Sequence, residues 1–136
     1  FTQYGLKTDA TGRYAAMYKP FHLIGLELSV SVLSAALRGE PTGCSREWRG
    51  DAVAAAKRNL RAGEMLDGEG GYTVWGKLVP AARSRTLDAL PIGLAHKVQL
   101  VRAVAAGAVV RWADVEMPDH DAVRARRVME RRFAGA

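Results

Sequence analysis

RNLRAGEML, at residues 58–66, and RAVAAGAVV, at residues 102–110, are two versions of one pattern, spaced 44 residues apart. In each stretch a basic residue is followed two positions later by an apolar residue, then by Ala-Gly and by an apolar pair. Glycine at this place suits a turn with positive φ, and the apolar neighbours would anchor that turn in a core. The sequence therefore predicts a duplicated supersecondary structure around Gly63 and Gly107.

The region that contains these turns, residues 51–118, has a β pattern. Short runs rich in Val, Leu, Tyr and Trp are interrupted by Gly or Pro, which is typical of short strands joined by turns. We expect strands at residues 52–56, 72–78, 98–102 and 109–112. Gly68-Glu69-Gly70-Gly71 precedes one of these strands rather than a helix, so it predicts a β-turn and not a pyrophosphate-binding loop.

Residues 1–50 have a different pattern, that of an apolar helix behind a polar lead-in. After Pro20, apolar residues recur at helical spacing, at Leu23, Leu26, Val30, Leu33 and Leu37. This spacing predicts a helix, which Gly39 and Pro41 would end. This helix has more apolar surface to bury than the lead-in, residues 1–20, can cover. Because Phe1 also stands where a methionine would be expected, we expect residues 1–50 to be the tail of a larger domain.

The composition is that of an ordinary globular protein. The chain has 136 residues, of which 49% are apolar and 25% charged, and this excludes wholesale disorder and collagen-like repetition. The longest apolar stretch, residues 23–37, is interrupted by Gly25 and Glu27 and is shorter than the roughly 20 residues of a membrane span. A single cysteine, Cys44, cannot form an internal disulfide, which fits a cytoplasmic location. We expect an α+β protein with no membrane partner.

The net charge of +6 is concentrated at the carboxyl end, where the last sixteen residues contribute half of it. A basic segment can bind nucleic acid, but no aromatic residues alternate with these arginines as base stacking would require. We therefore expect residues 119–136 to form a basic helix with a solvated arginine face, capped by Asp119. Its apolar positions would be Val123, Met129 and Phe133. Nucleic-acid binding is the less favoured alternative.

Two longer stretches, which include the repeated turns, together resemble a SAF domain. They are AAAKRNLRAGEMLDGEGGYTVWG, at residues 54–76, and LPIGLAHKVQLVRAVAAGAVVRWADVEM, at residues 90–117. SAF domains are small β-clip modules of type III antifreeze proteins, sialic acid synthases, flagellar P-ring chaperones and altronate dehydratases. Asp114 and Val115 occupy the place of the family's Asp-Val or Asp-Leu ending. The resemblance implies a β-clip fold for residues 51–118. It also implies either a scaffold role or a groove near Lys57, Arg58 and Arg102 for a sugar-like or phosphorylated ligand.

The upstream stretch YAAMYKPFHLIGLELSVSVLSAALRGEPTG, at residues 14–43, is similar to one group of larger proteins. These are homoserine-dehydrogenase-like oxidoreductases that end in a SAF domain, and one branch acts as a deoxyxylulose-phosphate reductoisomerase. The resemblance implies that residues 1–50 end the substrate and dimerisation domain of such a parent. NAD or NADP would be the parent's cofactor, with none bound by this part. The partners would be the rest of the parent chain and a second copy in a homodimer.

The candidate catalytic residues lie in YKPFHLIGLE, at residues 18–27. Lys19, His22 and Glu27 place a cation, an imidazole and a carboxylate around the start of a helix, where developing negative charge is favoured. By the resemblance they would act only in the full-length parent. The alternative is that His22 caps the helix and Glu27 pairs with a neighbour. This chain alone would be non-catalytic, or else a stand-alone module that binds a sugar acid or sugar phosphate.

No metal site is expected from the sequence. The three histidines are scattered, whereas metal sites gather three or four ligands. Cys44 lies in a loop without an orienting third group, so it does not predict a nucleophile–base pair with His22.

Overall fold

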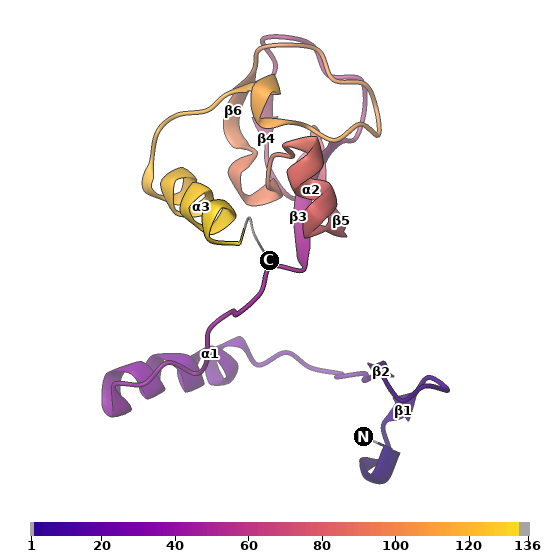
Figure 1. Cartoon of the computed structure of the whole chain (residues 1–136), viewed down its shortest axis with the longest axis vertical. Coiled ribbons are helices and arrows are strands. Elements are labelled where there is room, and N and C mark those ends of the chain that lie inside the picture. Colours follow the sequence, from indigo (N-terminus) through magenta and orange to yellow (C-terminus); the bar gives the residue numbers. More distant parts are fainter. Residues whose placement is uncertain (1, 134–136) are drawn as a thin grey trace. The chain divides into compact units, whose positions relative to one another are not determined.

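The computed structural model describes residues 2–133 and divides the chain into two compact units, Phe1–Cys44 and Ser45–Ala136 (Figure 1). Within the described residues the protein is α+β, with three α-helices and several antiparallel sheets of short strands. The expected class is therefore confirmed. The division between the units falls in the loop-like stretch at residues 41–50.

The first unit is built around one interrupted helix. Its elements are a 3₁₀ turn, η1 (Thr2–Tyr4), two short paired strands, β1 (Lys7–Thr8) and β2 (Ala15–Ala16), and helix α1 (Ile24–Leu33), which continues as a π-helical turn, η2 (Ser34–Arg38). Gly39 ends this helix with a φ of 65°, a left-handed conformation that glycine adopts without a steric penalty. The predicted helix and its end are confirmed, whereas the π-turn was not expected.

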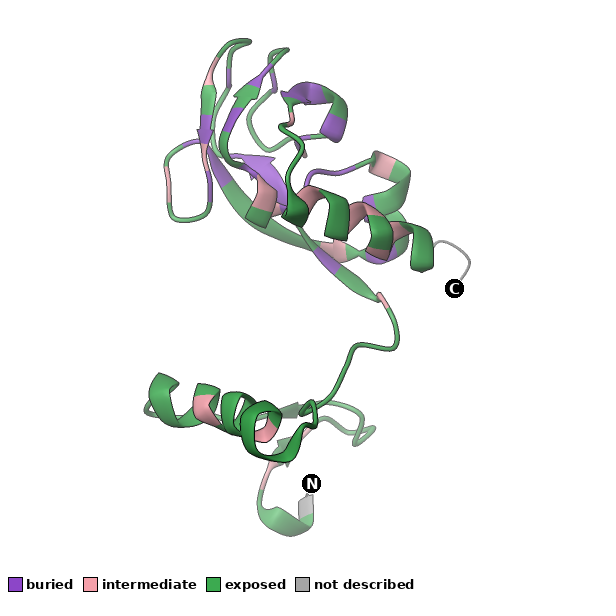
Figure 2. Cartoon of the chain, turned by 90° about the vertical axis from the view of Figure 1, so that its left-hand side faces the viewer, coloured by how far each residue is buried: buried purple, intermediate pink, exposed green. Residues whose placement is uncertain are grey.

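The described residues of the first unit form no hydrophobic core of their own. No described side chain between residues 3 and 44 is buried (Figure 2). Leu26 is 69% exposed and Val30 63%, although both belong to the apolar stripe of the helix. Residues 1–44 therefore do not supply the cover that their own helix requires.

The second unit contains two antiparallel sheets. In the first, β3 (Gly50–Ala56) pairs with β5 (Val74–Pro80); in the second, β6 (His96–Leu100) lies between β4 (Met65–Asp67) and β7 (Val115–Glu116). The strands expected at residues 52–56, 72–78 and 98–102 are confirmed, with ends shifted by up to two residues.

The strand expected at residues 109–112 is confirmed only in part. Val109 forms an isolated bridge with Ala55 and Arg111 forms one with Ala89, whereas Trp112 begins a 3₁₀ turn, η4 (Trp112–Asp114). The physical reason for this early end is local, because the Asp114 carboxylate accepts a hydrogen bond from the backbone N–H of Arg111 at 2.8 Å. Arg111 itself is extended, and the bond closes the turn that follows it.

Strand β3 lies at the centre of the core. Val53 and the three alanines that follow it are almost completely buried. One edge of β3 pairs with β5, and at the other edge Ala54 donates to Leu90 O and accepts from the Val110 N–H, both at 2.8 Å. Both edges of β3 are therefore hydrogen-bonded, and because four successive residues are buried, both of its faces lie in the interior. The core extends from it to Leu60, Leu66, Val98, Leu100 and Trp112.

The two repeated turns are bonded to each other. Leu60 and Val104, equivalent residues 44 positions apart, exchange both backbone hydrogen bonds, at 2.8 and 3.0 Å. Figure 1 shows the two turn segments, magenta and orange, side by side at one end of the second unit. The local symmetry axis of the duplication therefore passes between these two residues.

The hydrogen bonds around this axis occur in matching pairs. Gly63 N–H donates to Leu100 O at 2.7 Å, and its counterpart Gly107 donates to Ala56 O at 2.8 Å. Leu100 N–H in turn donates to Glu64 O, and Ala56 N–H to Ala108 O, both at 2.9 Å. Gly63 and Gly107 have φ values of 82° and 78°. The duplicated supersecondary structure that the sequence predicts is confirmed.

Two further helices belong to the second unit. Helix α2 (Ala81–Leu87) was not predicted; Pro80 precedes it, and Asp88 ends it with a φ of 49°. Helix α3 (Asp121–Arg132) confirms the expected carboxyl-terminal helix. The expected Asp119 cap is wrong, because His120 is the N-cap residue and Asp119 instead forms an ion pair with Arg124 at 2.7 Å. In the part of the chain that the structure describes, no helix has both the length and the apolarity to cross a membrane.

Candidate functional site

Lys19, His22 and Glu27 lie together in the first unit. Glu27 is in the first turn of α1, and one of its carboxylate oxygens forms an ion pair with Lys19. The other oxygen lies 2.7 Å from His22 Nδ1. His22 does not cap the helix, whose N-cap residue is Leu23. We call these three residues the Glu27 cluster.

The Glu27 cluster has the components of a proton-transfer site. A carboxylate that binds one imidazole nitrogen orients the ring and leaves the other nitrogen to exchange a proton. The Lys19 ammonium would supply a positive charge near developing negative charge. However, the side chain of His22 is 71% exposed, so water screens the cluster within this unit. It would act strongly only if another part of a protein covered it.

Lys57, Arg58 and Arg102 each contact another residue of the second unit. Lys57 Nζ donates to the carbonyl oxygen of Gly71, and Arg102 Nε lies 3.3 Å from Asp114 Oδ1. Arg58 forms an ion pair with Glu64, and the hydrogen bond from Arg58 lowers the pKa of that carboxyl. Each of the three cations therefore has an intramolecular partner of its own.

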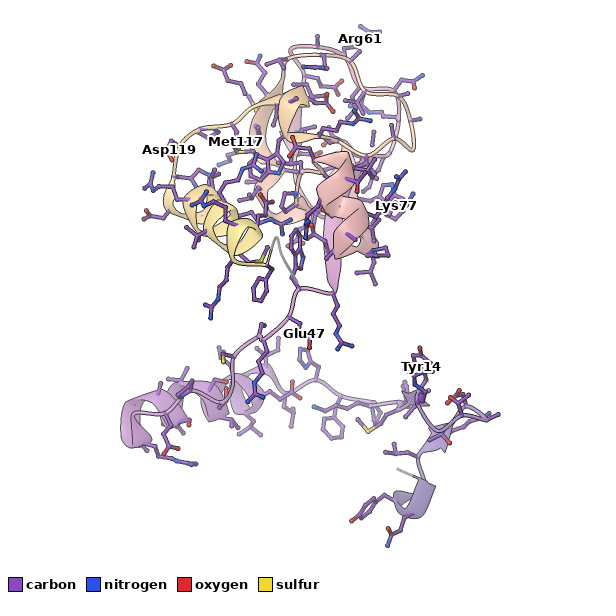
Figure 3. The ribbon with its side chains drawn as sticks, viewed as in Figure 1. Tyr14, Glu47, Arg61, Lys77, Met117 and Asp119 are labelled. Atoms are coloured by element: carbon purple, nitrogen blue, oxygen red, sulfur yellow. The ribbon has the colours of Figure 1, made fainter. Side chains whose placement is uncertain are left out.

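An open hollow of about 470 Å³ lies at the first repeated turn. Arg58, Asn59, Arg61, Ala62 and Glu64 line it, whereas Lys57 and Arg102 do not. The label for Arg61 in Figure 3 marks this end of the second unit, and that for Asp119 marks the approach to α3. The hollow corresponds only in part to the groove that the resemblance implies.

A second cavity, of about 410 Å³, lies between α2, α3 and the segment that leads into β3; we call it the α2–α3 pocket. Two indoles, those of Trp48 and Trp112, form part of its wall. Three arginines, Arg85, Arg127 and Arg131, also line it. Sequence reasoning missed this pocket because it depends on α2, which was not predicted, and on the docking of α3.

Helix α3 is held against the second unit by a buried ion network. Arg126 donates to both carboxylate oxygens of Asp51, at 3.0 and 2.5 Å, and to Glu130 at 2.7 Å. The Ser84 hydroxyl donates to the same Asp51 carboxylate at 2.5 Å. Burial by itself would lower the pKa of Arg126, but the hydrogen bonds to Asp51 and Glu130 outweigh burial and raise it. The network therefore keeps Arg126 charged inside the protein.

The expected solvated arginine face of α3 is wrong for two of its arginines. The side chain of Arg126 is only 13% exposed, and its guanidinium lies 4.7 Å from the centre of the Trp48 ring. The Arg127 guanidinium lies 3.7 Å from the centre of the Trp112 ring. Both cations are engaged with carboxylates and aromatic rings, so a phosphate would have to compete with these partners.

The Gly68–Gly71 segment forms the predicted turn, and Asp67 organises it. The carboxylate of Asp67 accepts hydrogen bonds from the Thr73 hydroxyl and from the backbone N–H groups of Tyr72 and Thr73. These bonds, that from the Thr73 side chain above all, lower the pKa of Asp67 to about 2. The acid has a structural role in this loop.

Within residues 2–133 no group of three or more His, Cys, Asp or Glu side chains could hold a metal ion. No protein-family model matches the chain, and no curated protein matches it. The resemblance to a SAF domain and to the larger oxidoreductases therefore stays a prediction.

Proposed function

We propose that this chain is the carboxyl-terminal part of an NAD(P)-dependent, homoserine-dehydrogenase-like oxidoreductase. In this proposal residues 51–118 are a SAF domain with β-clip topology, which helps to close the substrate site or to stabilise a dimer. Residues 1–50 are the end of the substrate and dimerisation domain, and residues 119–136 are the basic helix. The chain alone transfers no hydride, because its nucleotide-binding domain lies elsewhere in the parent. The free Cys44 fits a cytoplasmic protein.

The observation that carries the proposal is the uncovered helix α1. Ile24, Leu26, Leu28 and Val30 are each more than 60% exposed in a segment with no buried side chain. A helix that is apolar nearly all round is typical of a segment buried inside a larger domain. A parent domain would cover these side chains and at the same time exclude water from the adjoining Glu27 cluster.

The second support is the pair of repeated turns. The resemblance to SAF domains depends on two signature turns, and in this chain the corresponding segments are hydrogen-bonded through Leu60 and Val104. The backbone hydrogen bonds of Gly63 and Gly107 are equivalent in the two turns. This equivalence fits a compact module formed by duplication. Fold similarity alone does not define a function, so the oxidoreductase assignment depends on the first unit.

The test begins with the native gene upstream of the codon for Phe1. We expect an open reading frame that encodes a strand, a Gly-x-Gly-x-x-Gly loop and a helix, the dinucleotide-binding arrangement. The full-length product should then oxidise NADH or NADPH with a suitable carbonyl substrate. A start codon immediately before Phe1, with no upstream domain, would overturn the proposal.

The Glu27 cluster gives a sharper test in that full-length protein. His22→Ala should lower kcat by about 100-fold or more if the imidazole transfers a proton. His120→Ala is the matched control, since His120 lies at the start of α3 in the other unit. Equal activity of the two variants would remove the catalytic role of His22.

The alternatives have less support from the described contacts. A stand-alone sugar-acid or sugar-phosphate module at Lys57, Arg58 and Arg102 would have to break an intramolecular contact at each cation. Nucleic-acid binding by the tail would have to depend on its other arginines, because Arg126 faces Asp51 and Arg127 faces Trp112.

A further inference from the structure

The α2–α3 pocket contains two arginines without a carboxylate partner. Of its three guanidiniums, that of Arg127 is ion-paired, to Glu130 at 2.7 Å and to Asp88 at 3.7 Å. Both acids of the pocket therefore already face a cation. Arg85 donates to the Phe133 carbonyl oxygen at 3.3 Å, and among the described residues neither Arg85 nor Arg131 forms an ion pair. These two cations can attract an anion.

Three apolar side chains, those of Trp48, Ala89 and Trp112, complete the pocket wall together with Ser84. Trp112 and Ala89 are buried, and the half-buried indole of Trp48 lies against the Arg126 guanidinium of the ion network. The volume of about 410 Å³ falls in the usual range of small-molecule pockets. Apolar walls with a few fixed polar groups are typical of sites that bind and orient a small ligand.

The wall is also held rigidly at the end of α2. Asp88 ends the helix in the left-handed conformation, with a φ of 49°, and its backbone N–H donates to the Arg85 carbonyl oxygen. The carbonyl oxygen of Asp88 accepts a hydrogen bond from the backbone N–H of Trp112 at 3.0 Å. This bond connects α2 to η4, so the two sides of the pocket keep their positions before a ligand arrives.

We propose that the α2–α3 pocket binds a small organic anion, in which a carboxylate or phosphate group is attached to a flat apolar part. Arg85 and Arg131 bind the anionic group, and the indole of Trp48 contacts the flat part. This binding needs neither a nucleotide nor another part of a parent enzyme. The proposal therefore stands apart from the oxidoreductase assignment.

The test is an NMR titration of the 136-residue chain with phenyl phosphate and with benzoate. All three tryptophans lie in the second unit, and their indole N–H resonances are separate reporters. We expect saturable shifts at Trp48 or Trp112, with Trp75 on β5 as the internal reference. The tighter of the two probes identifies the anionic group. Phenol, which lacks the charge, should bind at least tenfold more weakly than the better probe.

Four variants make the test specific. Arg85→Gln and Arg131→Gln should each weaken binding about tenfold, the usual effect of losing one charge-assisted hydrogen bond. The matched controls are Arg83→Gln on α2 and Arg132→Gln on α3, because neither residue lines the pocket. All four side chains are exposed, so the urea midpoint should not change.

Three results would overturn the proposal: the absence of saturable shifts with both probes, equally tight binding of phenol, or losses in the controls as large as those in the pocket variants. The first would mean that the pocket is only a gap beside α3. The third would mean that anions gather unspecifically on the basic surface.

Discussion

Arg126 offers the sharpest test of how the second unit is held together. Arg126→Met keeps the apolar stem of the side chain but leaves the Asp51 carboxylate, 7% exposed, with only the Ser84 hydroxyl as a side-chain donor. Removing one partner of a buried ion pair typically costs about 3–5 kcal/mol, because the remaining charge stays buried without compensation. This is a large part of the roughly 5–15 kcal/mol that stabilises a typical domain.

The matched control is Arg124→Met on the same helix. Arg124 also forms two ion pairs, with Asp119 and Asp121, but its side chain is 54% exposed. Exposed pairs contribute about 0–1 kcal/mol. Urea unfolding followed by tryptophan fluorescence measures both variants, and since all three tryptophans lie in the second unit the signal comes from that unit.

A double-mutant cycle separates the ion pair from general damage. Asp51→Asn combined with Arg126→Met should be less destabilised than the sum of the two single variants, because the double variant has no unpaired buried charge. The reasoning is refuted if Arg126→Met and Arg124→Met differ by less than about 1 kcal/mol. In that case α3 would be held by its apolar contacts alone.

Further predictions concern the repeat, the acid loop and the first unit. Gly63→Ala and Gly107→Ala should each lower the free energy of unfolding by about 1–2 kcal/mol, since both positions have positive φ and open space for a Cβ; unequal urea results would argue against the symmetry. Asp67 has a pKa of about 2, below the ordinary value of 3.8. The stability that its carboxylate gives the folded state is therefore present above pH 3.8 and is lost as the pH falls through 2. Because the group is partly exposed, we expect about 1 kcal/mol. Asp67→Asn should flatten unfolding free energy against pH in that window, and an unchanged slope would contradict this role. Leu26→Glu with Leu33→Glu should lower binding of a hydrophobic dye to the chain and leave the urea midpoint of the second unit unchanged. Unaltered dye binding would show that α1 is covered in solution.

The sequence predicted the features that depend on neighbouring residues. The turns at Gly63 and Gly107 could be predicted because positive φ and a flanking apolar residue are local requirements, repeated at a fixed spacing. The helix ending at Gly39 followed from the same kind of signal. The Glu27 cluster also came together from residues only eight positions apart. Whether the Glu27 cluster can transfer protons depends on another part of a protein that would exclude water from it.

The features that were missed or only partly predicted have weak or competing local signals. The strand expected at residues 109–112 has the right residue types, but the Asp114 carboxylate binds the Arg111 N–H, and a turn begins at Trp112. Helix α2 has only seven residues, too short for a periodic pattern to stand out from the surrounding β pattern.

Sequence alone determined the two repeated turns, the end of the main helix and the lack of cover for that helix, because turn geometry and hydrophobic spacing act over a few residues. Only the tertiary structure decided which arginines face inward. Nothing in the α3 sequence distinguishes Arg126 from Arg124, yet Arg126 meets Asp51 across 75 residues of chain and becomes part of the interior. The α2–α3 pocket has the same origin, since a cavity exists only where separately encoded elements pack against one another.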